Sequence, residues 1–113
     1  MLISDKGRKG LRKYAGEEFV GKLERWSKTG LLNYIGKGFP LGSEGHGVFR
    51  LGERSSLTRA GGFFEFCRID LDRFIIIVVL KKRGQKFPQG VIDEIARVRD
   101  GKEWYEDVSS AQG

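Results

Sequence analysis

The chain has 113 residues, 39% of them hydrophobic, which suits one compact domain and leaves little room for a second core. Its 21 Lys and Arg residues exceed its 15 Asp and Glu residues, giving a formal net charge of +6. Charged residues follow Met1-Leu2-Ile3 directly, and the longest apolar run is far shorter than the about 20 residues that span a bilayer. We therefore expect no signal peptide, no membrane partner and a cytoplasmic location.

The excess of positive charge is unevenly distributed. Residues 1–92 carry 18 of the basic and 9 of the acidic side chains, whereas residues 93–113 carry 3 and 6. A basic body attracts polyanions such as nucleic acid, an acidic protein or a membrane surface. The alternative is that the charge serves solubility alone.

The N-terminal third of the sequence predicts helices. Residues 1–15 read as a basic arm or a short helix, and an edge strand within them stays open. Glu17 and Glu18 suit a helix N-terminus, and four apolar residues then recur with helical spacing: Phe19, Val20, Leu23 and Trp26. A second short stripe of Leu31, Leu32 and Ile35 predicts a helical hairpin.

The middle of the chain predicts a sheet. Residues 36–62 are rich in glycine and read as turns around a strand at Val48–Leu51. A second strand is expected at Phe63–Asp70, a hairpin turn at Asp70–Arg73, and a third strand at Phe74–Leu80. Because Phe74–Leu80 is apolar at every position, we expect this strand to be central and covered on both faces.

A last helix is expected to begin near Pro88, and residues 104–113 read as a frayed tail. The sequence thus predicts a single α+β domain over residues 1–113. In it, an N-terminal helical hairpin packs on a small, mainly antiparallel twisted sheet, followed by a C-terminal helix.

Most familiar enzyme sites are excluded. One histidine and one cysteine do not supply a metal-ligand cluster, and the sequence contains no Walker loop or dinucleotide fingerprint. We expect neither a metal nor a cofactor.

Cationic side chains are the remaining candidates. A basic loop, Lys81-Lys82-Arg83-Gly84-Gln85-Lys86, follows the apolar strand directly, and further arginines come from the neighbouring strands and loops. Converging Lys and Arg side chains bind phosphates, and they can stabilise a phosphorane-like transition state. The alternative is a solvated charge run at a strand end. The candidate phosphate-contacting residues are Arg50, Arg54, Arg59, Arg68, Lys81, Lys82, Arg83 and Lys86.

The order of these segments resembles the RelE/HigB superfamily of bacterial toxins, in particular its phage-derived HigB branch. The resemblance covers roughly residues 17–100. It lies in Gly47–Leu51, in Gly61–Phe66, in Phe74–Leu80 with the following Lys-Lys, in Gln85–Pro88 and in Ile95-Ala96-Arg97.

The resemblance implies a toxin of a type II toxin–antitoxin system, an mRNA interferase that cleaves ribosome-bound mRNA by attack of a 2′-OH on the adjacent phosphate. It implies a RelE-like fold and, as partners, mRNA, the ribosome and a small helix-turn-helix antitoxin. The catalytic set would be Arg50, Lys82 and Arg83. Apart from the resemblance, His46 is the one histidine of the sequence and lies between Gly45 and Gly47, before the strand of Arg50; it is a candidate proton shuttle, and the favoured alternative is a turn histidine. RNA contacts would come from Arg54, Arg59, Arg68, Lys81 and Lys86.

Two other functions stay open. One is a ParE-like relative that inhibits gyrase by binding. The other is a non-catalytic RNA- or protein-binding module, which two departures from the family pattern favour. Glu65 stands where the family has a strand arginine, and Phe87 stands where many members have a Tyr or His.

Overall fold

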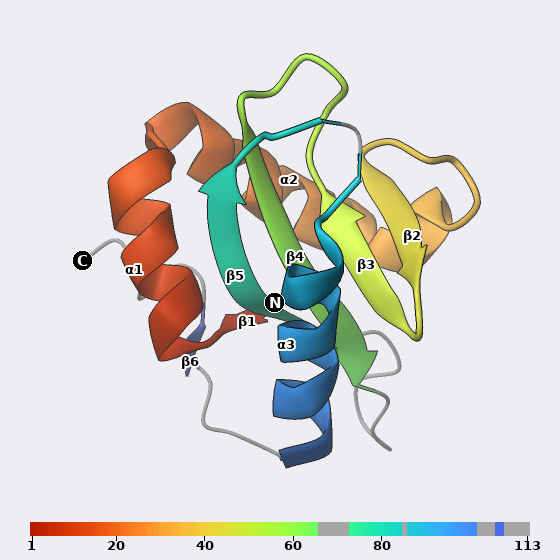
Figure 1. The fold of residues 1–113 in the computed structure, drawn as a ribbon. Helices are drawn as coiled ribbons and strands as arrows, with labels where there is room; N and C mark the ends of the chain where they lie inside the picture. Colours follow the sequence, from red (N-terminus) through yellow and green to blue (C-terminus); the bar gives the residue numbers. More distant parts are fainter. Residues whose placement is uncertain (66–72, 85, 102–105, 108–113) are drawn as a thin grey trace.

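The fold is that of a computed structural model, which describes residues 1–65, 73–84, 86–101 and 106–107. Within these residues, one sheet has the strand order β2-β3-β4-β5-β1-β6. The strands are β1 (Leu2–Ile3), β2 (Leu41–Gly45), β3 (Val48–Leu51), β4 (Thr58–Glu65), β5 (Arg73–Lys81) and β6 (Glu106–Asp107). β5 pairs in parallel with β1 (Leu2–Ile3), and the other pairs are antiparallel. Helix α3 (Gln89–Gly101) covers one face, α2 (Glu17–Thr29) covers the other, and α1 (Asp5–Tyr14) lies beside β5 (Figure 1). The α+β class is therefore confirmed.

The strand predicted to be central is β5 (Arg73–Lys81). Its register against β4 (Thr58–Glu65) shifts between Gly61 and Gly62, so Ile77 is a bulge residue. Phe74, Ile76 and Val79 pack in a core with α1 and α2, whereas Ile75, Ile77 and Val78 pack in a second core with α3. The expectation that this strand is buried on both faces is confirmed.

The helix predicted after Glu17 is α2 (Glu17–Thr29), and its four predicted apolar residues are all buried. The second helix of the predicted hairpin is not formed. Residues Leu31–Tyr34 make a single 3₁₀ turn, η1, in which Leu31 is buried and Leu32 is exposed. Gly30 adopts a φ of 95°, which ends α2, and too few residues follow before the next glycines for an amphipathic helix.

The basic N-terminal segment, left open between an arm, a helix and a strand, forms the short strand β1 (Leu2–Ile3) and then helix α1 (Asp5–Tyr14). Ser4 caps it by accepting a hydrogen bond from Gly7 N at 3.1 Å. A Cβ added at Gly10 would lie 2.1 Å from the carbonyl oxygen of Val79, so the helix backbone packs directly against β5. α1 thereby covers the edge of β5 beyond its short pairing with β1.

The glycine-rich region contains more strand than the sequence predicts. β3 (Val48–Leu51) is as expected, but β2 (Leu41–Gly45) precedes it, and β4 begins at Thr58 instead of Phe63. A Cβ on Gly61 would lie 2.5 Å from the Phe87 ring and 2.9 Å from Cδ1 of Ile95, so a glycine is required where this strand meets α3. The predicted turn at residues 70–72 and strand residues 66–70 lie outside the described residues.

The last helix is α3 (Gln89–Gly101), which begins after Pro88 as predicted. It buries Ile92, Ile95 and Val98 against the sheet. In the segment predicted to be a tail, Glu106–Asp107 forms strand β6, paired with β1, and the remaining residues of that segment lie outside those described.

Candidate nucleic-acid interface

The basic loop crosses the end of the sheet between β5 and α3 (Figure 1). Lys82 anchors it, because its backbone N–H donates to Leu57 O and its Nζ donates to Arg54 O, both at 2.8 Å. Arg83 and Lys86 are exposed. Gly84 has a φ of 112°, a conformation that disfavours any side chain at this turn. The loop is therefore tied to residues 53–57 while its other cations point into solvent.

Two arginines lie buried beneath this loop. Arg50 in β3 is 8% exposed, and Arg59 in β4 is 2% exposed. Both guanidinium groups lie against the ring of Phe39, with their central carbons 5.0 and 5.9 Å from its centroid. Arg54 stacks on the same ring at 4.6 Å. One aromatic side chain thus gathers three of the predicted cations.

The side chain of Arg50 is held by local acceptors. It forms an ion pair of 2.9 Å with Glu44 and donates to Gly38 O at 2.9 Å. Glu44 also accepts a hydrogen bond of 3.3 Å from the backbone N–H of Phe87. The pair therefore joins β2, β3 and the start of the α3 segment, which is a structural role.

Arg59 is held without a carboxylate. Its guanidinium donates to the backbone oxygens of Ser56 and Thr58 at 2.9 and 3.3 Å, and to that of Arg54 at 3.4 Å. Within the described residues no carboxylate lies at ion-pair distance from it, and its buried Nε has no hydrogen-bond partner. Burial, and then the charge of Arg50, lower the pKa of Arg59 below its usual value. Arg59 therefore braces the 53–58 loop and adds positive potential beneath it.

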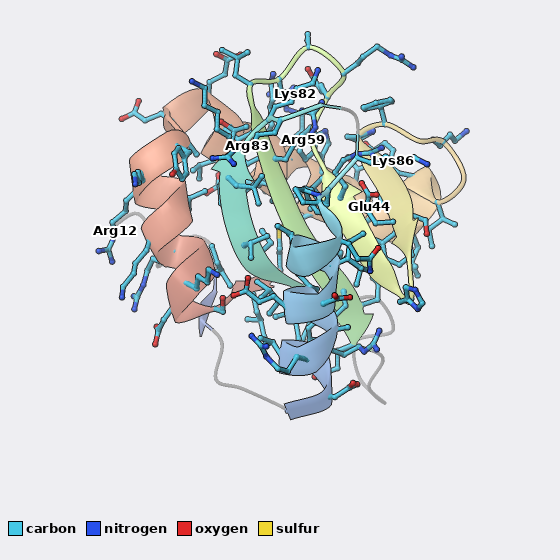
Figure 2. The ribbon with its side chains drawn as sticks, in the orientation of Figure 1. Arg12, Glu44, Arg59, Lys82, Arg83 and Lys86 are labelled. Atoms are coloured by element: carbon cyan, nitrogen blue, oxygen red, sulfur yellow. The ribbon has the colours of Figure 1, made fainter. Side chains whose placement is uncertain are left out.

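Four cations surround this end of the molecule, and we call them the basic rim: Arg54, Lys82, Arg83 and Lys86. Arg59, Lys82, Arg83 and Lys86 are seen at the same end of the sheet in Figure 2. Lys81 is also exposed, at the last position of β5. Solvent-facing guanidinium and ammonium groups above buried cations form a surface suited to phosphate oxygens.

His46 lies away from the basic rim. It occupies the β2–β3 turn with a φ of 53°, and its carbonyl oxygen accepts a hydrogen bond from the Arg99 guanidinium near the end of α3. Phe49, at the start of β3, pairs with Gly62 of β4, and Gly62 pairs with Ile76 of β5. Lys82 comes six residues after Ile76, toward the opposite end of the sheet. At about 3.3 Å per residue, His46 and Lys82 are roughly 20 Å apart. The structure does not bring His46 together with Lys82 and Arg83.

Two residues of this region were not anticipated from the sequence. Phe39 stacks three arginines, and Glu44 neutralises one of them. Glu44 did leave a signal, because it is the sole acidic residue between positions 25 and 52. Arg68, another predicted RNA contact, lies outside the described residues.

Comparisons with known proteins give no relative from which a role could be transferred. No family model matches the chain, and neither the curated proteins nor the solved structures contain a detectable match. Among the described residues, no helix is long and apolar enough to cross a membrane. In the same residues, His, Cys, Asp and Glu side chains form no group of three or more that could hold a metal ion.

Proposed function

We propose that the protein binds RNA through the basic rim and acts on it as a toxin of the RelE/HigB type. The observation that carries the proposal is the convergence of Arg54, Lys82, Arg83 and Lys86 at the exit of the central strand, above two buried arginines. Phosphate contacts with such a rim position an RNA strand without reading its sequence. The resemblance over residues 17–100 supports the toxin assignment, with a small helix-turn-helix antitoxin and the ribosome as partners.

In the proposed reaction, a ribose 2′-OH loses its proton and attacks the adjacent phosphorus, and the 5′-oxygen of the next nucleotide leaves and is protonated. The products are a 2′,3′-cyclic phosphate and a 5′-OH. Arg83 and Lys86 would hold the phosphate whose charge rises in the transition state. Lys82, already fixed by Arg54 O, would be positioned beside it.

Growth arrest tests the proposal. Expression of the unaltered chain should arrest growth, and Lys82→Ala with Arg83→Ala should abolish the arrest. Arg25→Ala with Lys28→Ala is the matched control, because it also removes two cations, from exposed positions of α2. The purified protein with ribosomes and message should yield fragments ending in 2′,3′-cyclic phosphate. Absence of arrest with the unaltered chain, or full arrest with the rim double variant, refutes the proposal.

A second candidate, a non-catalytic RNA-binding module, is favoured by one observation. Arg50 is engaged by Glu44 and buried, and Arg59 is engaged by loop carbonyls and buried. These two arginines therefore lie beneath the rim, where they add to its potential without touching RNA. The module predicts salt-sensitive RNA binding with the message intact after incubation with ribosomes.

A further inference from the structure

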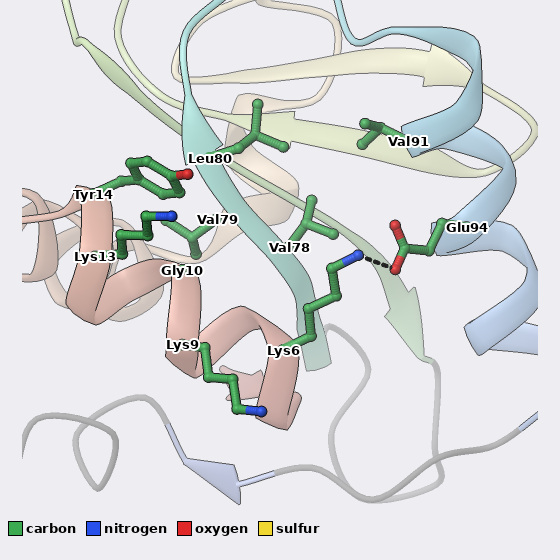
Figure 3. Close-up of a pocket in the computed structure, with 10 residues that line it drawn as sticks. All are labelled: Lys6, Lys9, Gly10, Lys13, Tyr14, Val78, Val79, Leu80, Val91 and Glu94. Atoms are coloured by element: carbon green, nitrogen blue, oxygen red, sulfur yellow. Dashed lines mark hydrogen bonds and ion pairs between the residues drawn. The ribbon is translucent and has the colours of Figure 1, made fainter.

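A groove of about 340 Å³ lies between α1 and α3 (Figure 3), and none of the four rim residues lines it. Its floor is aliphatic, made by Val78 and Leu80 of β5, and Val91 of α3 forms its far wall. Leu80 and Val91 are half-buried, so part of this apolar surface is exposed to solvent. Leu80 and Val91 are therefore available for contact with another molecule.

One wall of the groove is a row of lysines. Lys6, Lys9 and Lys13 of α1 are three and four residues apart, so their side chains lie on one side of the helix. Lys6 forms an ion pair with Glu94 of α3 across the groove, so one lysine of the row already has a carboxylate partner. Within the described residues, Lys9 and Lys13 have no carboxylate at ion-pair distance. The ammonium of Lys13 lies 5.2 Å from the centroid of the Tyr14 ring.

We propose that this groove binds an acidic amphipathic helix of a partner protein. The aliphatic floor matches the apolar side chains of such a helix, and the lysine row matches its carboxylates. A partner strand is disfavoured, because β1 and α1 already cover the edge of β5. α1 has 10 residues and is about 15 Å long, so an occupant of about three turns would match it.

The proposal does not depend on the RNA-binding proposal, because the groove and the basic rim consist of different residues. An RNA strand is the weaker occupant here. Its phosphates would match the lysines, but it has no aliphatic groups to cover Val78, Leu80 and Val91.

The test uses fluorescence anisotropy with the full chain at physiological salt. The probe is a labelled synthetic helix of about three turns with leucines along one side and glutamates flanking them. A peptide of the same composition in scrambled order is the control for charge alone. We expect the amphipathic peptide to bind at least about ten-fold more tightly than the scrambled one, since only it can cover the floor while its glutamates meet the lysines.

Two matched pairs of variants locate the site. Lys13→Glu should weaken peptide binding about five-fold, whereas Arg12→Glu, on the same helix but outside the groove and pointing away from it in Figure 2, should leave it unchanged. Val91→Asp should weaken it more than about ten-fold, whereas the neighbouring Gly90→Asp should not. All four positions are exposed or half-exposed, and circular dichroism verifies that each variant is folded.

Several results would overturn the inference: no binding of the amphipathic peptide, equal binding of the scrambled peptide, or equal effects within each matched pair. Displacement of the peptide by oligouridine, with RNA affinity lost in Lys13→Glu but not in Arg12→Glu, would also overturn it and assign the groove to RNA. Failure of the RNA proposal gives a different pattern. In that case Arg83→Ala would leave the affinity for RNA unchanged, and binding of the amphipathic peptide would still support the groove proposal.

Discussion

Glu44 and Arg50 form an ion pair of 2.9 Å between neighbouring strands, with side chains only 2% and 9% exposed. The carboxylate also accepts the Phe87 N–H, so one acidic group links β2, β3 and the segment that leads into α3. Arg50 was predicted as a catalytic residue because the resemblance to the RelE/HigB toxins places their basic strand residue at this position. Its contacts give it a structural role that any activity measurement on Arg50 variants has to take into account.

Removal of Glu44 alone should destabilise the protein strongly. Glu44→Ala leaves the Arg50 charge buried without its carboxylate, and we expect a loss of about 3 kcal/mol in the free energy of unfolding. The double variant Glu44→Leu with Arg50→Met should recover most of that loss, because neither charge is then buried. Urea unfolding of Glu44→Leu, of Arg50→Met and of their double variant measures the coupling. A cost below about 1 kcal/mol for Glu44→Ala would show that the pair is not important for stability.

The contact of α1 with β5 makes a second prediction. Gly10→Ala should destabilise the protein by about 1–3 kcal/mol, because the added methyl group would meet the Val79 carbonyl, which is backbone and cannot rotate away. Gly21→Ala in α2 is the control, since nothing lies within 4 Å of its Cβ and alanine favours the helix by about 0.5–1 kcal/mol. Thermal unfolding should move in opposite directions for the two variants. Equal shifts would mean that α1 does not pack closely on β5.

The sequence predicted the elements that have a clear apolar period. The spacing of Phe19, Val20, Leu23 and Trp26 predicted α2, and the uninterrupted run at Phe74–Leu80 predicted β5 and its burial. These signals come from side chains whose burial drives folding, so they are strong within one segment.

The elements that the sequence did not predict depend on contacts with distant residues. β4 begins at Thr58, but in the sequence its Gly61-Gly62 pair is typical of a turn. The close approach of Phe87 to Gly61 and the bulge in β5 opposite the two glycines explain why they lie within a strand. β2 shows no alternation of apolar and polar residues, so its sequence does not indicate a strand. It is held in part by the contacts of Glu44 with Arg50 and with the Phe87 N–H.

The candidate site was predicted in part for the same reason. The cations of the basic loop were evident from their order along the chain, and Arg54 and Arg59 were singled out as well. The burial of Arg50 and Arg59 against Phe39, and the distance of His46 from the loop, follow from strand register, which one sequence does not reveal.

Salt dependence tests how many rim cations contact RNA. If the four members of the basic rim each neutralise one phosphate of single-stranded oligouridine, the logarithm of the affinity should fall with the logarithm of salt concentration with a slope of about −3. Arg83→Ala or Lys86→Ala should each reduce that slope by about 0.7. Lys37→Ala, an exposed cation outside the rim, is the control and should leave the slope unchanged. An unchanged slope in both rim variants would place the RNA elsewhere on the molecule.

His46 gives the last prediction, because it was a candidate proton shuttle and the strand register places it roughly 20 Å from Lys82. His46→Ala should therefore leave growth arrest and oligouridine affinity within about two-fold of those of the unaltered chain. His46→Ala also changes the backbone strain in the turn. The φ of 53° suits glycine better than alanine, so His46→Gly controls for strain in the turn. Loss of RNA cleavage in both variants, with the fold intact by circular dichroism, would mean that the catalytic centre lies at the β2–β3 turn and that the rim only holds the RNA.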